Sequence, residues 1–328
     1  MKSTIHRTTR PLLFGAALLL ALGGCAQEGF ESSDLQQTRH SLQTTLERDV
    51  RPAVTRTHPE PLEVREATRR FYRGRGYAPA WADENGLVAG VEELMTALEE
   101  ARGRGLAAHS TTELSAMIEE LEAARERGEP MARPLARLDL QLTRSYLRLA
   151  SELIDGRVEP ETARIAWYTH PRKIDAVTRL EAALAADRVG NSLIELDPPH
   201  EGYRQLLKGL ASYHDIARAG GWPQVPADDD GSALEKGDEG EAVRLLAHRL
   251  AVTGDLRVRN LDPESLPSSY DGTIEIAVRR FQSRHGLPTD GVVGAETLAA
   301  LNVPVERRLR QMEANVERWR WLPADLGS

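Results

Sequence analysis

Hydrophobic positions recur at helical spacing along most of this chain. Leucine, alanine and valine return every three or four residues, and the alternation of β-branched residues typical of strands is rare. This spacing gathers apolar residues on one face of a helix. It predicts helices over residues 173–187 and 200–218, preceded by three helices whose apolar stripes are Val91, Leu94, Met95, Leu98 and Ala101; Leu114, Met117, Ile118 and Leu121; and Leu135, Leu138, Leu142, Tyr146, Leu149 and Leu153. We therefore predict a mainly α protein.

A second, smaller helical unit is predicted at residues 233–304. It follows a linker at residues 222–232 that belongs to a stretch rich in Gly, Pro and Asp, a composition typical of domain boundaries. A tight turn is predicted at residues 288–291, where glycine supplies the positive φ that other residues avoid. Three short helices are expected, with the apolar residues Val243, Leu246, Ala247 and Leu250; Ile274, Ala277, Val278 and Phe281; and Leu298 and Leu301.

The last predicted helix, residues 305–319, carries a marked apolar stripe. An apolar stripe on a helix needs a partner surface. We predict that this stripe is poorly packed in the chain by itself, so that it could dock a separate domain. Its members are Val305, Leu309, Met312, Val316 and Trp319.

The first 24 residues have the character of a secretory signal peptide. Three basic residues precede an uncharged apolar run at residues 11–22, which is too short to span a membrane. Leu22-Gly23-Gly24-Cys25 resembles the lipobox of bacterial lipoproteins, and this resemblance implies cleavage before Cys25 and a lipid on its sulfur. The alternative is an ordinary signal peptide with an incidental cysteine. Residues 25–60 are expected to be a polar tether with one helix from Asp34 to Glu47, and the protein is expected to be an exported, membrane-anchored lipoprotein on the periplasmic side.

Charge and cysteine content narrow the possible partners. The formal charge is −8, and the first 24 residues hold three basic residues and no acids, which leaves −11 on the remainder. Nucleic acids and anionic lipid surfaces both select basic proteins, so neither is expected as a partner. The chain has one cysteine and therefore no intrachain disulfide. Neither a metal nor a cofactor is expected.

The stretch from Tyr270 to Asn302 carries the most specific pattern. Its characteristic positions include Phe281-Gln282, Gly286-Leu287, Asp290-Gly291 and Gly294. With the helix that follows Leu234-Glu235-Lys236-Gly237-Asp238, this pattern resembles a small three-helix peptidoglycan-binding domain, which implies bacterial cell wall as the ligand.

Further motifs extend the resemblance over most of the chain. They occur in the order typical of large multidomain bacterial L,D-transpeptidases, whose helical scaffold region precedes a peptidoglycan-binding domain. These motifs are Phe71-Tyr72-Arg73-Gly74-Arg75-Gly76-Tyr77 with Pro79-Ala80-Trp81, Leu138-Asp139-Leu140-Gln141-Leu142-Thr143, Gly156-Arg157-Val158-Glu159-Pro160, Pro198-Pro199-His200-Glu201-Gly202-Tyr203 and Asn315-Val316-Glu317-Arg318-Trp319-Arg320-Trp321-Leu322-Pro323. The resemblance implies that residues 61–221 are a scaffold domain and that residues 305–328 lead toward a catalytic domain.

The catalytic domain of that family supplies a Cys nucleophile and a His base, and it would begin after about Leu326. We therefore expect no catalytic residue in this chain. Cys25 is no substitute, because a thioether sulfur cannot form the thiolate that such chemistry requires. Residues 103–108 fit a dinucleotide-binding pattern but follow a helix, and His200-Glu201 lacks the second His of a zinc-protease motif.

Four residues of the small unit are candidates for ligand contact, and each also has a structural interpretation. Arg279 and Arg284 could pair with stem-peptide carboxylates or could be solvated arginines on a helix face. Gln282 could contact ligand or could be a buried amide that ties a loop, and Asp290 could contact ligand or simply form the turn.

These observations favour a lipid-anchored, non-catalytic protein that binds peptidoglycan. One alternative is part of an active L,D-transpeptidase whose Cys/His domain lies beyond Ser328 or on another chain. A second alternative is an adaptor or decoy lipoprotein that recruits wall enzymes.

Overall fold

The protein is mainly helical, as predicted. The structure, a computed structural model, describes residues 29–48, 61–106, 111–158, 172, 174–227 and 233–326. The predicted signal peptide, Cys25, residues 49–60 of the predicted tether and residues 228–232 of the predicted linker lie outside the described residues. None of the helices in these described ranges has both the length and the apolar character of a membrane crossing.

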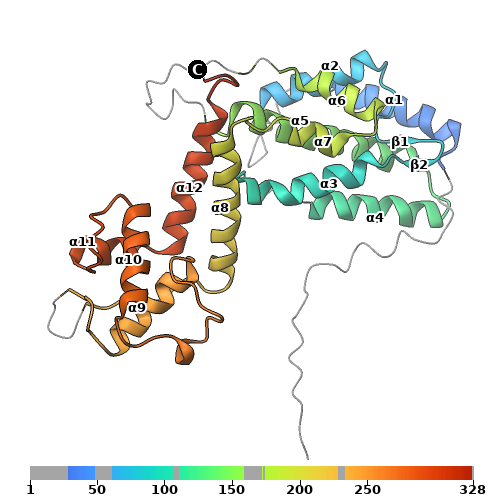
Figure 1. Cartoon of the computed structure of the whole chain (residues 1–328). Coiled ribbons are helices and arrows are strands. Elements are labelled where there is room, and N and C mark those ends of the chain that lie inside the picture. The colour runs from blue at the N-terminus through green and yellow to red at the C-terminus, as the bar shows by residue number, and fades with distance from the viewer. Residues whose placement is uncertain are drawn as a thin grey trace, which may run out of the picture.

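A helical body forms around one long central helix, α5 (Figure 1). Helices α1, α2, α4 and α6 pack directly against α5, while α3 contacts both α5 and α7. The predicted stripe of α5 is confirmed, because all six of its residues are fully buried. The elements of the body are α1 (Ser32–Arg48), α2 (Leu62–Gly74), the short antiparallel pair β1 (Ala82–Asp83) and β2 (Gly86–Leu87), α3 (Gly90–Glu100), the 3-10 turn Ala101–Arg104, α4 (Thr112–Glu126), α5 (Ala132–Asp155), α6 (Ala176–Ala185) and α7 (Val189–Ile194).

Helix α1 corrects the predicted tether. The sequence predicts a helix from Asp34 to Glu47 within a polar tether. The helix is present, but it packs along α5. Leu42 is fully buried, and the Thr38 hydroxyl donates to the carbonyl of Ala132 at 3.4 Å. Residues 30–48 therefore belong to the folded body, and the polar composition that suggested a tether reflects the outer face of an amphipathic helix.

A buried carboxylate, Asp139 on α5, organises the centre of the body. Its oxygens accept the backbone N–H groups of Ala80 and Trp81 at 2.8–3.1 Å and the hydroxyl of Tyr72 at 2.6 Å. Thr143, one turn along α5, accepts the indole N–H of Trp81 at 2.9 Å and lies 2.8 Å from the Tyr72 oxygen. Because the Tyr72 proton goes to the carboxylate, Thr143 must donate to Tyr72. These side chains fix the 77–81 loop between α2 and β1 onto α5.

A two-helix hairpin leads away from the body to the small domain (Figure 1). Helix α8 (Glu201–Arg218) runs outward, and α12 (Val305–Arg320) returns antiparallel along it. The apolar cluster between them contains Tyr203, Leu210, Leu309 and Val316, with Met312 and Trp319 packed against it.

The prediction that the stripe of α12 is poorly packed is wrong. Val305, Leu309 and Val316 are buried, and Met312 and Trp319 are half-buried against α8. The partner surface is supplied by α8 of the same chain, so this face is not open for a separate catalytic domain. The sequence pattern identified an amphipathic helix correctly but could not say which surface covers it.

Small residues allow the two helices of the hairpin to approach closely. A Cβ atom added at Gly202 would lie 2.6 Å from the Trp319 ring, and one at Gly209 would lie 3.0 Å from the terminal methyl of Met312. The ring of Trp319 also packs at 5.4 Å from the imidazole of His200, whose Nε2 donates to the carbonyl of Pro323 at 2.9 Å.

A buried ion pair fastens the end of α12 to the body. Arg320 is fully buried, and its guanidinium contacts a Glu317 carboxylate oxygen at 3.1 Å and the carbonyl of Arg104. The other oxygen of Glu317 accepts the backbone N–H groups of Arg157 and of Val158, the latter at 2.9 Å. The pair is thus hydrogen-bonded on both sides, which compensates for its removal from water.

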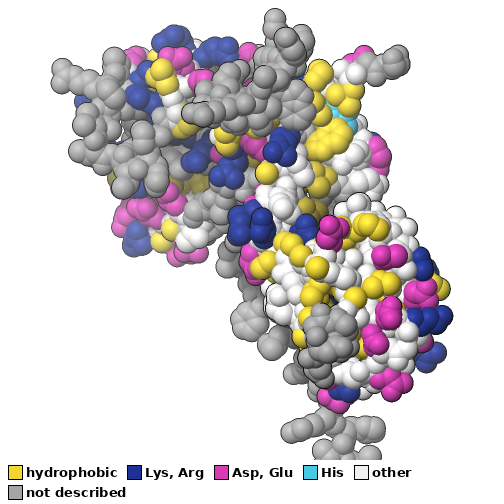
Figure 2. Space-filling model, turned by 90° about the vertical axis from the view of Figure 1, so that its left-hand side faces the viewer, with side chains coloured by type: hydrophobic (Ala, Val, Ile, Leu, Met, Phe, Trp, Pro, Cys, Tyr) yellow, Lys and Arg dark blue, Asp and Glu magenta, His cyan; other side chains and the backbone are white. Residues whose placement is uncertain are grey.

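The small domain, residues 233–304, lies at the tip of the hairpin. It contains α9 (Glu241–Val252), the 3-10 turn Pro263–Ser265, α10 (Gly272–Arg284) and α11 (Ala295–Leu301). Backbone bridges Leu234–Val293 and Glu239–Ser269 close it. Figure 2 shows it projecting from the body with charges of both signs on the visible face. Its core is separate from that of the body and also includes Val225 from the segment that enters the domain. The core residues within the domain are Leu234, Val243, Leu246, Ala247, Leu250, Ala251, Leu256, Leu266, Tyr270, Ile274, Ala277, Val278, Phe281, Val293 and Leu301.

The buried position of Asp139 predicts a specific pH dependence of stability. Burial raises the pKa of Asp139 to about 6, against the opposing effect of its hydrogen bonds. The folded state therefore holds this proton more tightly than the unfolded state, and the stability gained from it below pH 4 is lost as the pH rises to 6. The loss should be on the order of 3 kcal/mol.

Urea unfolding of the wild type and of Asp139→Asn between pH 4 and 7.5 measures this effect. The difference between their free energies of unfolding should change across pH 4–6 and stay flat above pH 7. Two curves that remain parallel over the whole range would show that Asp139 does not titrate in this window.

Candidate functional site

Helix α10 places different side chains on its two faces. Asp271 caps its N-terminus by accepting the backbone N–H groups of Thr273 at 2.8 Å and Ile274 at 3.0 Å. The inner face is buried in the small domain, as predicted. The outer face presents Ile276, Arg279, Arg280 and Ser283, which share the i, i+3, i+4, i+7 spacing of one helix surface.

Gln282 ties the loop after α10 to the domain core. Its side chain is buried, and its amide nitrogen donates to the Asp290 carboxylate at 2.8 Å, the Val292 carbonyl at 2.9 Å and the Thr297 hydroxyl at 3.2 Å. Its amide oxygen accepts the backbone N–H of Gly291 at 2.9 Å. Both ends of the amide are therefore used within the domain.

The turn at Gly291 depends on glycine. Gly291 has φ of 77°, and a Cβ atom there would lie 2.9 Å from Cγ of Glu275 and 3.0 Å from Nε of Arg279. The buried hydroxyl of Tyr270 donates to the Gly291 carbonyl at 2.6 Å, and burial raises the pKa of this tyrosine. The loop is thus held closely against α10.

A shallow groove runs along the outer face of α10 to this loop. Its lining consists of Ile276, Arg279, Arg280, Ser283, Arg284 and Thr289, so every charged side chain in the lining is an arginine. Ile276 is 54% exposed although it is a large aliphatic residue. A cationic lining with an exposed aliphatic side chain suits an anionic organic ligand.

The first guanidinium of the groove is held in place by its neighbours. Arg279 donates to the carbonyl of Thr289 and pairs with the Glu275 carboxylate at 2.9 Å. The hydrogen bond from Arg279, followed by that from Lys236, lowers the pKa of Glu275.

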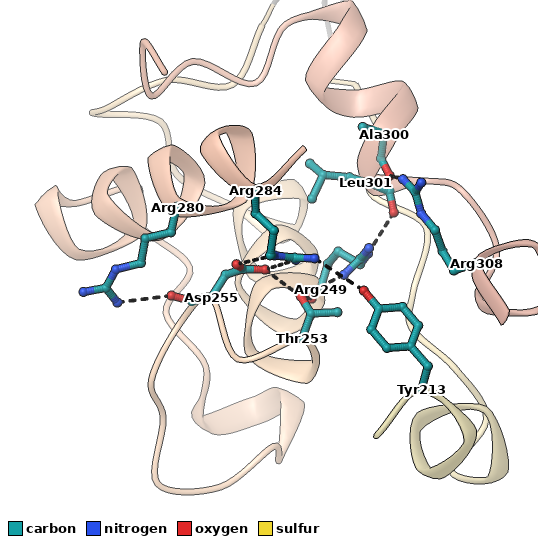
Figure 3. A network of polar contacts seen from close by, with 9 residues as sticks. All are labelled: Tyr213, Arg249, Thr253, Asp255, Arg280, Arg284, Ala300, Leu301 and Arg308. Carbon is teal, nitrogen blue, oxygen red and sulfur yellow. Dashed lines mark hydrogen bonds and ion pairs between the residues drawn. The ribbon is translucent and has the colours of Figure 1, made fainter. Parts of the chain in front are cut away.

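Arg284 joins the groove to a polar network that reaches the hairpin (Figure 3). It forms two hydrogen bonds with the buried carboxylate of Asp255, at 3.2 and 2.6 Å, and a third, at 3.4 Å, to the hydroxyl of Tyr213 on α8. Burial alone would lower the pKa of Arg284, but the Asp255 carboxylate more than offsets this effect and the pKa is raised.

Arg249 anchors the small domain to the segment that enters it. Its side chain is 1% exposed, donates to the Leu301 carbonyl at 2.8 Å and lies 3.8 Å from the centre of the Trp222 ring. Burial lowers the pKa of Arg249 to about 10, so the group is still cationic at neutral pH. The indole of Trp222 in turn donates to the Val303 carbonyl at 3.2 Å.

The two chain segments that connect the hairpin with the small domain are also bonded to each other. The backbone N–H and C=O of Val225 each form a 2.8 Å hydrogen bond with the side chain of Asn302. Part of the predicted 222–232 linker is therefore fixed in place at residues 222–225.

His285 lies beside this network, and its surroundings favour the neutral form of the imidazole. Its ring packs 4.1 Å from the Phe281 ring. Burial, followed by the charges of Arg284, Arg308 and Arg249, lowers the pKa of His285 to about 4.

The four predicted ligand residues occupy different positions. Arg279 and Arg284 line the groove, whereas Gln282 points into the core and Asp290 accepts hydrogen bonds from Gln282 and from the backbone of Val292. Their roles as ligand contacts stay predictions. Sequence reasoning missed Ile276, Arg280, Ser283 and Thr289, although the helical spacing of the first three could have indicated the outer face.

Comparison with known families assigns both folded parts of the chain. Residues 66–210 match the family model described as a scaffold domain. Residues 239–301 match the model described as a putative peptidoglycan binding domain. No curated protein matches the chain significantly.

The central position of Gln282 predicts that its isosteric replacement by glutamate is costly. At neutral pH the new carboxylate would face the Asp290 carboxylate and the Val292 carbonyl with no proton to donate to either. We expect Gln282→Glu to destabilise the small domain by about 2–4 kcal/mol at pH 7, and by less at pH 4, where glutamate is largely protonated.

Thermal and urea unfolding of Gln282→Glu measures this cost. Gln311→Glu makes the same chemical change at an exposed position of α12 and should leave stability nearly unchanged. Equal stability of the two variants at pH 7 would contradict the assigned role of Gln282.

Proposed function

From a scaffold domain and a putative peptidoglycan-binding domain in one chain, we propose a non-catalytic protein that binds the bacterial cell wall. The peptidoglycan-binding domain carries this proposal, and the helical body and hairpin hold that domain at a distance. Helix α12 has 16 residues and is therefore about 24 Å long. The small domain can thus contact a polymeric ligand without the helical body obstructing it.

We also propose that the chain is related to the large multidomain L,D-transpeptidases. The motifs that resemble this family support the relation, as does the order of scaffold and peptidoglycan-binding domains. Several of these motifs come together in space: the two that contain Tyr72 and Asp139 form one polar network, and those that contain Val158, His200 and Trp319 lie at the base of the hairpin.

The third part of the proposal is attachment to a membrane through lipid on Cys25. The basic start, the apolar run and the lipobox-like sequence support it. The protein would then be exported and would bridge membrane and wall.

Sedimentation with purified peptidoglycan sacculi tests the wall-binding proposal. The full-length chain should sediment with sacculi, and Gln311→Glu should behave like the wild type. Gln282→Glu should lose binding in proportion to the fraction of its small domain that is unfolded under the assay conditions. Wild-type protein that stays in the supernatant would overturn the proposal, and undiminished binding of an unfolded Gln282→Glu domain would assign binding to the helical body.

The same sacculi provide a second readout. After incubation with the purified chain, their muropeptide profile should be unchanged, because no catalytic residue is proposed. New or broken crosslinks would overturn the non-catalytic part of the proposal.

Lipid attachment is tested by fatty-acid labelling in the native host. The wild type should incorporate label and fractionate with membranes, whereas Cys25→Ala should do neither. An unlabelled wild type would indicate that Cys25 follows an ordinary signal peptide.

A further inference from the structure

The groove on α10 is a local cationic site on an otherwise acidic domain. Residues 233–304 contain eleven acidic and eight basic residues, yet the charged side chains of the groove are Arg279, Arg280 and Arg284. A general attraction of the domain for anions therefore cannot account for binding there, and any such binding must depend on these three side chains.

Arg280 is the cation of the groove that the structure leaves least neutralised. Arg279 is paired with Glu275, and Arg284 with Asp255. Arg280 is exposed and makes a long hydrogen bond of 3.4 Å to the backbone carbonyl of Asp255, with no ion pair to any residue that the structure describes. Its guanidinium retains several N–H donors in the planar arrangement that matches a carboxylate.

The neighbours of Arg280 prepare the site for a peptide. The pairs made by Arg279 and Arg284 restrict these side chains, which reduces the entropy lost when a ligand binds between them. Ser283 and Thr289 offer hydroxyl groups, and exposed Ile276 offers an apolar contact. The lining contains no aromatic ring on which a sugar could stack.

We propose that this groove is the subsite for the stem peptide of peptidoglycan, with Arg280 binding a free carboxylate of that peptide. The proposal rests on the proposed wall-binding function and deepens it, because it assigns recognition to the peptide and not to the glycan strand. Ile276 then contacts the aliphatic part of a peptide side chain, while Arg279 and Arg284 contribute long-range attraction.

Sedimentation with chemically modified sacculi tests this subsite. The full-length chain is titrated with intact sacculi, with sacculi whose free carboxylates have been amidated, and with glycan strands from which an amidase has removed the peptides. The variants are Arg280→Gln and a matched control, Arg259→Gln, which removes the same charge from an exposed loop of the same domain.

If Arg280 binds the free carboxylate, removing the arginine and removing the carboxylate should have the same effect on binding. Loss of one charge-assisted contact should weaken wild-type binding about tenfold, whether it results from amidation or from Arg280→Gln. Amidation should then weaken the binding of Arg280→Gln much less than that of the wild type, because only the long-range attraction by Arg279 and Arg284 remains to be lost. Arg259→Gln should match the wild type. Peptide-free glycan strands should bind weakly to every variant.

Two results would overturn the subsite and leave the wall-binding proposal intact. One is equal binding of the wild type to peptide-free strands and to intact sacculi. The other is an Arg280→Gln variant that binds intact sacculi as tightly as Arg259→Gln. Failure of the wild type to bind intact sacculi would instead overturn the proposed function itself.

Discussion

The antiparallel packing of α8 and α12 is the constraint on which the arrangement of this molecule depends. The helical body and the small domain have separate hydrophobic cores, and the hairpin joins them. Its apolar seam could slide or separate without directional contacts. The buried Glu317–Arg320 pair provides these, because it bonds to backbone groups of Arg104, Arg157 and Val158 in the body. Such a pair contributes mainly specificity of position, since its Coulomb energy is largely offset by desolvation.

The helical body and the small domain each contain a titratable group whose pKa is shifted by burial, and the two shifts have opposite directions. In the body, burial favours the protonated, neutral form of Asp139. In the small domain, burial and nearby arginines favour the deprotonated, neutral form of His285. Protonation at low pH therefore stabilises the surroundings of Asp139 and destabilises those of His285.

Helix positions could be predicted well from the sequence, because apolar spacing depends on local geometry. The stripe of α5 and the bounds of α8 are close to those observed. Two features could not be predicted in this way. The partner of α12 is a surface formed by residues about a hundred positions earlier. Helix α1 packs against a face of α5, which lies about a hundred positions later in the chain. Both are contacts between distant segments, which a periodic pattern in one segment cannot specify.

The candidate site shows the same division. The pattern around Gln282 and Asp290 indicated the type of domain, and the structure explains its composition through the hydrogen bonds that close the 287–293 loop. A recognisable motif consists mostly of residues that the fold itself requires, such as these. The fold places fewer requirements on the identity of the surface residues that could contact a ligand. Arg280 was therefore missed, although it lies beside Arg279 on the same helix.

The bonding of Val225 to Asn302 has a consequence for durability. The small domain is inserted within the chain, so two polypeptide crossings, and not one, join it to the body. A protease that cuts one of these two connecting segments leaves the other intact. The packing of α8 against α12 would then hold the cut ends close to their original positions. Mechanical load from a captured polymer would likewise be divided between two covalent connections that run side by side.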